Sequence, residues 1–268
     1  MVQTELSYKN RCGYTILEQP VYNDGQFIYG QLYRPQRAGQ VPLVIFSHEL
    51  TYTHETGIEY AKELASLGVA VYIFDYRGGS VRSRSDGETT NMSVMTEVAD
   101  LEAVLKTAQS WDFVDAGRII LLGASQGGVV ASIVASRHVD ELHAMILMYP
   151  ALLINDDIHR MFKSLDKVPD RMRYLGWIPV GKRYVADMWD FDVYRDMGRF
   201  DKPVLLLHGD KDGAVPLSYS ERAAEVYPNG RLHVIKGGRH LFPTRQSLQE
   251  ALGQIIEFLA EQGIVLKQ

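Results

Sequence analysis

Six short apolar runs, each bounded by turn residues and followed by a helical pattern, constrain this chain more than any other feature. Val, Ile and Leu predominate in these runs, and most of them lack the alternating polar residues of a strand that faces water on one side. The helical segments carry apolar residues at three- and four-residue spacing. The runs are 41–47, 69–75, 118–123, 144–149, 203–208 and 231–235, and the helical segments include 57–67, 94–110, 127–137 and 248–262. This pattern predicts an α/β fold, with a mostly parallel central sheet and helices on both faces.

Two segments depart from this rhythm. The chain opens with a β-meander in which Asp24-Gly25 separates two strand-like runs, a strong hairpin signal. Between the runs that end near 152 and begin at 203 lie about fifty residues, far more than the ~2–6 of an ordinary βα connection. This stretch is rich in Met, Tyr and Trp. We therefore expect a short cap, approximately 153–200, inserted into one domain that spans 1–268.

Composition excludes several classes of partner. The net charge is −5 and no basic run is present, which argues against nucleic acid. Cys12 is the only cysteine, so an intrachain disulfide and four-cysteine zinc sites are excluded. No apolar stretch approaches the ~20 residues that cross a bilayer, and the N-terminus carries no signal pattern. We expect no membrane partner and a cytoplasmic location, and the sequence leaves the oligomeric state, a homodimer included, open.

The pattern G-x-S-x-G occurs at residues 123–127 and makes Ser125 the candidate nucleophile. Alone it is weak, since a chain of this length contains one by accident roughly one time in ten. Here it directly follows the apolar run 118–122 and directly precedes a helical run. That strand–turn–helix setting exposes a nucleophilic hydroxyl and brings a helix N-terminus beside it. The alternative is a glycine-rich βα turn that only connects the two elements.

A serine hydroxyl attacks only when a base removes its proton and a carboxylate orients that base. Asp212 lies in the loop after the run 203–208, at the strand end where open α/β sheets place their ligands. Asp210 is the rival, but as a turn residue beside Gly209 it fits a loop-capping role better. His240 follows the next strand-like run. The order serine, acid, histidine is the one expected of such a triad.

The oxyanion of the tetrahedral intermediate needs preorganised N–H donors. We expect these from the backbone of Gln126, just after the nucleophile, and from Leu50 in the loop after the run 41–47. The His-Glu pairs at 48–49 and 54–55 do not form H-E-x-x-H, and no third ligand is placed beside them. We therefore expect neither a metal nor an organic cofactor.

The chain resembles the cinnamoyl and feruloyl esterases of gut bacteria, a branch of the α/β-hydrolase superfamily close to the monoacylglycerol lipases. The similarity spans nearly the whole chain. It is carried by residues 74–80, 85–94, 123–130, 208–212 and 238–240. The resemblance implies the α/β-hydrolase fold and a serine esterase of the carboxylesterase type (EC 3.1.1). Its implied substrates are small esters, with aromatic, hydroxycinnamoyl-type or short to medium acyl groups.

The resemblance also implies a cap that recognises an aromatic acyl group. Tyr184 and Asp157 fall where the family's phenol-contacting tyrosine and aspartate lie. Trp189 is a further candidate for substrate contact, although the aromatic residues of the cap serve equally well to pack it onto the sheet.

One departure from the family concerns the oxyanion loop, which usually reads His-Gly-Phe and here reads His48-Glu49-Leu50. Loss of the glycine restricts the backbone, Glu49 brings a carboxylate towards a site that stabilises negative charge, and the acyl pocket loses a phenyl ring. Two alternatives to an esterase stay open. One is a lipase, thioesterase or peptidase that uses the same triad, and the other is a non-catalytic α/β-hydrolase scaffold, which would be free to lose the three triad residues that this chain retains.

Overall fold

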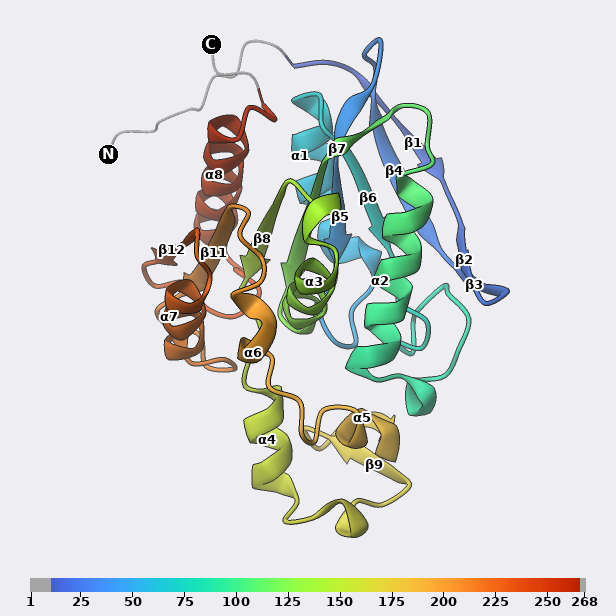
Figure 1. The fold of residues 1–268 in the computed structure, drawn as a ribbon, viewed down its shortest axis with the longest axis vertical. Coiled ribbons are helices and arrows are strands. Elements are labelled where there is room, and N and C mark those ends of the chain that lie inside the picture. Colours follow the sequence, from blue (N-terminus) through green and yellow to red (C-terminus); the bar gives the residue numbers. More distant parts are fainter. Residues whose placement is uncertain (1–10, 266–268) are drawn as a thin grey trace.

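A twisted sheet of eight strands forms the centre of the computed structural model, which describes residues 11–265 (Figure 1). The strand order is β1-β4-β6-β5-β7-β8-β11-β12; β1 pairs antiparallel with β4, and β4 with β6, whereas the other neighbours are parallel. The strands are β1 Tyr14–Glu18, β4 Gly30–Pro35, β5 Val41–Ser47, β6 Ala70–Phe74, β7 Val114–Ala124, β8 Ala144–Met148, β11 Val204–Gly209 and β12 Gly230–Ile235. The predicted mostly parallel sheet is confirmed.

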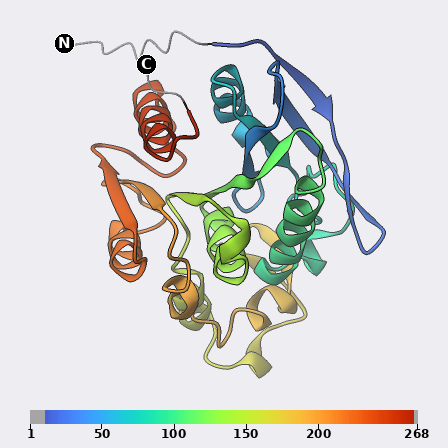
Figure 2. The ribbon, with the colours of Figure 1, turned by 45° about the horizontal axis from the view of Figure 1, so that its top comes forward.

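Helices cover both faces of this sheet, and the two side-chain rows of each strand feed separate cores. In β5, Leu43 and Ile45 face the core under α2, α3 and α7, whereas Val44 and Phe46 face the core under α1 and α8 (Figure 2). All four side chains are fully buried, which is why β5 reads as a continuous apolar run. The helices are α1 Ile58–Ser66, α2 Val94–Ala108, α3 Gln126–Arg137, α7 Leu217–Val226 and α8 Arg245–Glu261.

The predicted hairpin at Asp24-Gly25 joins β2 (Val21–Asn23) to β3 (Gln26–Ile28). Asp24 and Gly25 both have positive φ, 49° and 77°, as the tight turn of a two-residue hairpin requires. This hairpin is separate from the main sheet.

The segment 153–200, referred to below as the cap segment, lies beyond the carboxyl ends of the parallel strands (Figure 1). Its elements are α4 Ile154–Met161, β9 Arg171–Tyr174, β10 Ile178–Gly181, α5 Lys182–Ala186 and α6 Tyr194–Met197. The two short strands form an antiparallel hairpin of their own. The division into one domain with an inserted cap stays a prediction.

The structure differs from the sequence-based expectation at two places, an interrupted strand and an additional helix. The strand-like run before Asp24-Gly25 is interrupted after β1, so its end belongs to the β2–β3 hairpin. Helix α7 is not predicted by the sequence pattern, since Ser, Glu and Arg occupy half of its positions and it buries little apolar surface. Within the described residues, no helix combines the length and apolar character needed to cross a membrane.

Candidate active site

Ser125 lies in a strained turn between β7 and α3. Its backbone angles are φ 51° and ψ −117°, a conformation that is costly for a residue with a side chain and that is typical of functional sites. Glycines on either side allow it. A Cβ on Gly123 would lie 2.4 Å from the carbonyl oxygen of Gly127, and a Cβ on Gly127 would lie 2.2 Å from that of Ser47. The pattern G-x-S-x-G therefore reflects close backbone packing around the serine.

Three predicted residues meet at this turn. The Nε2 atom of His240 lies 3.1 Å from the Oγ atom of Ser125, and its Nδ1 atom lies 2.7 Å from Oδ2 of Asp212. The Asp212 side chain is 1% exposed and that of His240 is 21% exposed. The imidazole can thus accept the serine proton while the buried carboxylate holds its other nitrogen.

Asp212 is held by four hydrogen-bond donors. Its Oδ1 atom accepts from the N–H groups of Ala214 and Val215, at 2.8 and 2.9 Å. On the Oδ2 side, Nε2 of the fully buried His208 lies 3.3 Å away, in addition to His240. Burial alone would raise the pKa of Asp212, but hydrogen bonds from His208, His240 and the Val215 N–H outweigh it and hold that pKa well below its ordinary value. The acid is therefore fully ionised at neutral pH.

His208 was not singled out from the sequence, where it ends an apolar run. Its Nδ1 atom lies 2.7 Å from the Oγ atom of Ser220, and its Nε2 atom lies 2.9 Å from the carbonyl oxygen of Val215. Because a carbonyl only accepts, Nε2 carries the proton, and the same nitrogen lies 3.3 Å from Oδ2 of Asp212. The rival acid, Asp210, is exposed and accepts instead from the N–H of Gly237 at 2.6 Å.

The two residues expected to supply oxyanion donors follow β5 and β7, the strands on either side of the point where the strand order reverses. The chain passes from β5 outward to β6 and then returns to β7 on the other side of β5, which leaves a crevice at the carboxyl ends of β5 and β7. Leu50 follows β5, and Gln126 begins α3. The N–H of Gln126 belongs to the first turn of that helix and has no intrahelical acceptor. Among residues 11–265, the N–H of Leu50 donates no backbone hydrogen bond either.

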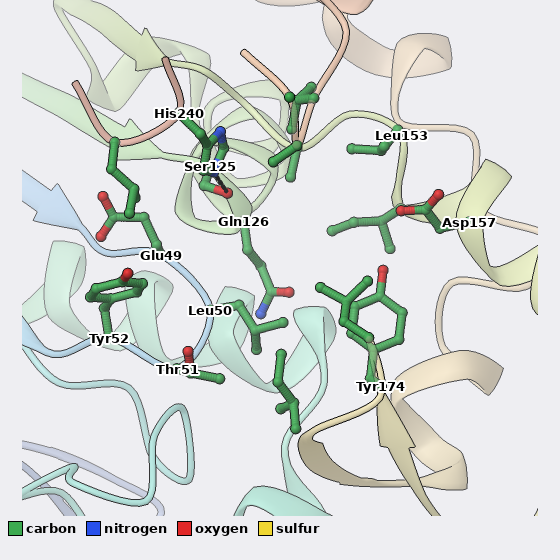
Figure 3. A pocket seen from close by; sticks show the side chains of 18 of the residues that line it. Glu49, Leu50, Thr51, Tyr52, Ser125, Gln126, Leu153, Asp157, Tyr174 and His240 are labelled. Atoms are coloured by element: carbon green, nitrogen blue, oxygen red, sulfur yellow. Dashed lines mark hydrogen bonds between the residues drawn. The ribbon is translucent and has the colours of Figure 1, made fainter. Parts of the chain in front are cut away.

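A cavity of about 600 Å³ opens beside Ser125 and runs beneath the cap segment. Figure 3 places Ser125 and His240 on one side and Asp157 and Tyr174 on the opposite side, with Leu153 between them along one wall. Burial raises the pKa of Asp157, whose carboxylate also pairs with Arg160 at 3.0 Å. An apolar space with a few polar groups at its ends is typical of a site for a small organic molecule.

The residues of the cap segment that the sequence analysis names differ in whether they line the cavity. Asp157 and Tyr184 both line the cavity, although the Tyr184 hydroxyl donates to the side chain of Gln126 at 2.6 Å. Tyr174, which was not proposed, is the cap tyrosine that Figure 3 places near Asp157. Trp189 does not line the cavity; its ring packs against that of His159, at 4.3 Å between centroids. The structure therefore gives Trp189 a packing position and does not support its expected contact with substrate.

Comparison with known proteins identifies the family. Residues 58–263, from the start of α1 to just past the end of α8, match the prolyl oligopeptidase family. The chain belongs to this family. It is a serine hydrolase with the α/β-hydrolase fold, as the sequence predicted.

Solved structures and curated relatives agree with this assignment. Est1E from Butyrivibrio proteoclasticus, in a structure with bound ferulic acid, superposes with a TM-score of 0.83 at 27% identity, covering 91% of this chain and 98% of Est1E. The quorum-quenching protein AidA of Acinetobacter baumannii is 23% identical, over 85% of this chain and 89% of AidA. A monoacylglycerol lipase of Mycolicibacterium smegmatis is 23% identical, over 65% of this chain and 71% of the lipase.

The carboxylate of Glu49, in the loop expected to supply an oxyanion donor, is engaged by two hydroxyl groups. Its Oε1 atom accepts from Tyr149 at 2.9 Å and its Oε2 atom from Thr56 at 2.8 Å. Glu49 is 4% exposed. The ring of Tyr149 in turn packs against that of His240, at 4.8 Å between centroids. The residue that replaces the usual glycine is thus hydrogen-bonded to the tyrosine that packs against His240.

Replacing Tyr149 with phenylalanine is expected to lower the free energy of unfolding by about 1–3 kcal/mol, because a buried carboxylate loses a hydrogen-bond donor. Urea unfolding at neutral pH measures this difference. Tyr22→Phe is the matched control, since Tyr22 is 62% exposed and the loss of its hydroxyl leaves no buried group without a partner. Equal unfolding free energies for Tyr149→Phe and the parent would show that the Glu49 contact contributes nothing.

Among residues 11–265, no group of three or more His, Cys, Asp or Glu side chains is placed to hold a metal ion.

Proposed function

We propose that this serine hydrolase is a carboxylic ester hydrolase that acts through an acyl-enzyme on small esters, with aromatic hydroxycinnamoyl-type or short to medium acyl groups. The observation that carries the proposal is the cavity of about 600 Å³ that adjoins the Ser125 hydroxyl and has Asp157 and Tyr174 at its opposite side. A flat aromatic acyl chain would lie against the apolar wall. Its ring hydroxyl would reach the polar groups at the end, as the fold's likeness to Est1E with ferulic acid supports.

The proposed reaction has two acyl-transfer steps. His240 removes the Ser125 proton as Oγ attacks the ester carbonyl, and the N–H groups of Gln126 and Leu50 bind the oxyanion that forms. The imidazolium, stabilised by ionised Asp212, then protonates the leaving alcohol. Water activated by the same imidazole attacks the acyl-enzyme, and release of the acid restores the serine. The 3.1 Å contact of His240 with Ser125 and the 2.7 Å contact with Asp212 support these roles.

Hydrolysis of a substrate panel tests the proposal. It contains p-nitrophenyl acetate, butyrate and octanoate beside methyl ferulate, ethyl cinnamate and a monoacylglycerol, with Ser125→Ala as the inactive control. We expect the highest kcat/KM for the hydroxycinnamate esters. Turnover of the simple acyl esters alone would keep the ester hydrolase and remove the aromatic acyl group. No turnover of any ester would overturn the proposed function.

Peptidase activity is the second candidate, because the family takes its name from an oligopeptidase. The triad can cleave an amide as well as an ester, and the difference lies in the leaving group that His240 must protonate. A prolyl p-nitroanilide added to the same panel separates the two functions. Cleavage of this amide at a kcat/KM above that of every ester would favour the peptidase.

A further inference from the structure

Glu97 is a buried carboxyl group that the triad chemistry does not use. It lies on α2 with 1% of its surface exposed, and its Oε2 atom accepts a hydrogen bond from Nε2 of Gln126 at 2.8 Å. No basic side chain within residues 11–265 forms an ion pair with Glu97, and Arg77 pairs with Asp100, one turn further along α2. Burying an acid without a basic partner destabilises a fold. Its presence therefore points to a role in the site that it contacts.

The other end of the Gln126 amide is also occupied. Its Oε1 atom accepts a hydrogen bond from the hydroxyl group of Tyr184 at 2.6 Å, and Tyr184 is fully buried on α5 of the cap segment. In Figure 3 the Gln126 side chain extends away from Ser125 toward Leu50. The hydrogen bonds thus join three elements that are distant in sequence: α5 of the cap segment, α3 after the nucleophile, and α2 beneath it.

Gln126 is also the residue whose backbone N–H is expected to bind the oxyanion. An oxyanion donor stabilises the transition state only if it is held in place before charge develops. We propose that Tyr184, Gln126 and Glu97 form a hydrogen-bonded chain that fixes this donor, so that Tyr184 and Glu97 are positioning residues for the chemical step. The inference rests on the proposed function, because acyl transfer is the reaction in which Gln126 meets an oxyanion. It reassigns Tyr184, which the family resemblance places against the acyl group.

In this hydrogen-bonded chain Glu97 acts in its neutral, protonated form. Burial raises the pKa of Glu97 to about 8, against the lowering effect of the Gln126 hydrogen bond, and repulsion from Asp100 on the same helix adds to the rise. The groups facing it from other elements carry no positive charge. They are the buried phenols Tyr76 and Tyr184 and the buried His48, whose pKa is lowered by burial. Ionisation above pH 8 would place a negative charge beside the oxyanion site.

Three variants test the proposal on the full-length protein. Tyr184→Phe and Glu97→Met are each expected to lower kcat about tenfold with KM nearly unchanged, because they loosen a donor that acts in the transition state. Glu97→Gln keeps an acceptor for Gln126 and mimics the neutral acid, so it is expected to restore kcat to within about threefold of the parent. A rise in KM with kcat unchanged in Tyr184→Phe would overturn the proposal in favour of acyl-group binding.

The pH dependence supplies a readout that a merely structural role would not change. The parent kcat is expected to fall above pH 8, and Glu97→Gln is expected to remove that fall. Because the folded-state pKa lies above the ordinary 4.5, the folded state binds the extra proton and the parent loses stability as pH rises from about 4.5 to 8. The thermal midpoint of Glu97→Gln should therefore depend less on pH over this window. An alkaline fall in kcat that persists in Glu97→Gln would overturn the proposal.

A matched control separates positioning from cap docking. Asp187, one residue after α5, accepts a hydrogen bond from Ser93 at 2.6 Å and so also ties the cap segment to α2, without reaching Gln126. Asp187→Ala should leave kcat closer to that of the parent than Tyr184→Phe does. Equal losses of kcat in the two variants would overturn the proposed positioning role of Tyr184. All variants are also compared by their rate of Ser125 labelling with a fluorophosphonate, whose reaction forms an anionic oxygen. This labelling rate tests the role of the hydrogen-bonded chain even if the protein hydrolyses no ester.

Discussion

Ser125→Ala is expected to lower kcat/KM for any ester that the parent hydrolyses by at least about 10⁴-fold, because no other group can form the acyl-enzyme. The substitution removes one oxygen from a turn whose strain comes from its backbone, so the fold should persist. The variant should also lose all covalent labelling by a fluorophosphonate. Intact-protein mass spectrometry after incubation with the probe measures this directly, as one adduct on the parent and none on the variant.

Ser136→Ala is the matched control for this experiment. Ser136 lies on the same helix, and its hydroxyl donates to the carbonyl oxygen of Ile133 at 2.8 Å, away from His240. The control loses the same atom and should keep both labelling and turnover. Labelling of Ser125→Ala at the parent rate would exclude Ser125 as the nucleophile.

The fold could be predicted from the sequence because strands buried on both faces must be apolar at every position. The run 41–47 coincides with β5 for this reason, and its two side-chain rows feed two different cores. Local backbone chemistry was equally informative. The glycines around Ser125 and the Asp24-Gly25 turn are required by geometry within a few residues, which a linear sequence records.

The supports of the site could not be predicted, because they join residues far apart in the chain. The contact between Tyr149 and Glu49 spans 100 positions, and that between Tyr184 and Gln126 spans 58. A buried tyrosine or glutamate looks the same in sequence whichever partner it meets. The cap segment shows the same difficulty, since its short elements give weak periodicity. Tyr174, and not only Tyr184, lines the cavity, whereas Trp189 does not.

The second large effect is expected at Asp212, where the pattern of donors makes the outcome of Asp212→Asn unusually definite. Both carboxylate oxygens face only N–H groups: those of Ala214 and Val215 on Oδ1, and those of His240 and His208 on Oδ2. An asparagine amide has one oxygen and one NH₂ group, so either orientation turns NH₂ hydrogens toward donors. With its NH₂ toward His240, the amide favours the tautomer in which Nδ1 is the acceptor and Nε2 carries the proton.

That tautomer cannot accept the proton of Ser125, so kcat at neutral pH is expected to fall by about 10⁴-fold. Asp210→Asn is the control. It is the same chemical substitution, two residues away in the same loop, and the Asp210 side chain accepts a hydrogen bond only from the N–H of Gly237 in an exposed turn. Urea unfolding of both variants shows whether each remains folded at the assay temperature. If Asp210→Asn lost as much activity as Asp212→Asn, or if Asp212→Asn stayed within about tenfold of the parent, the assignment of the triad acid would be wrong. Because four N–H donors surround the Asp212 carboxylate and only one reaches Asp210, we expect a large loss of activity in Asp212→Asn and a small one in Asp210→Asn.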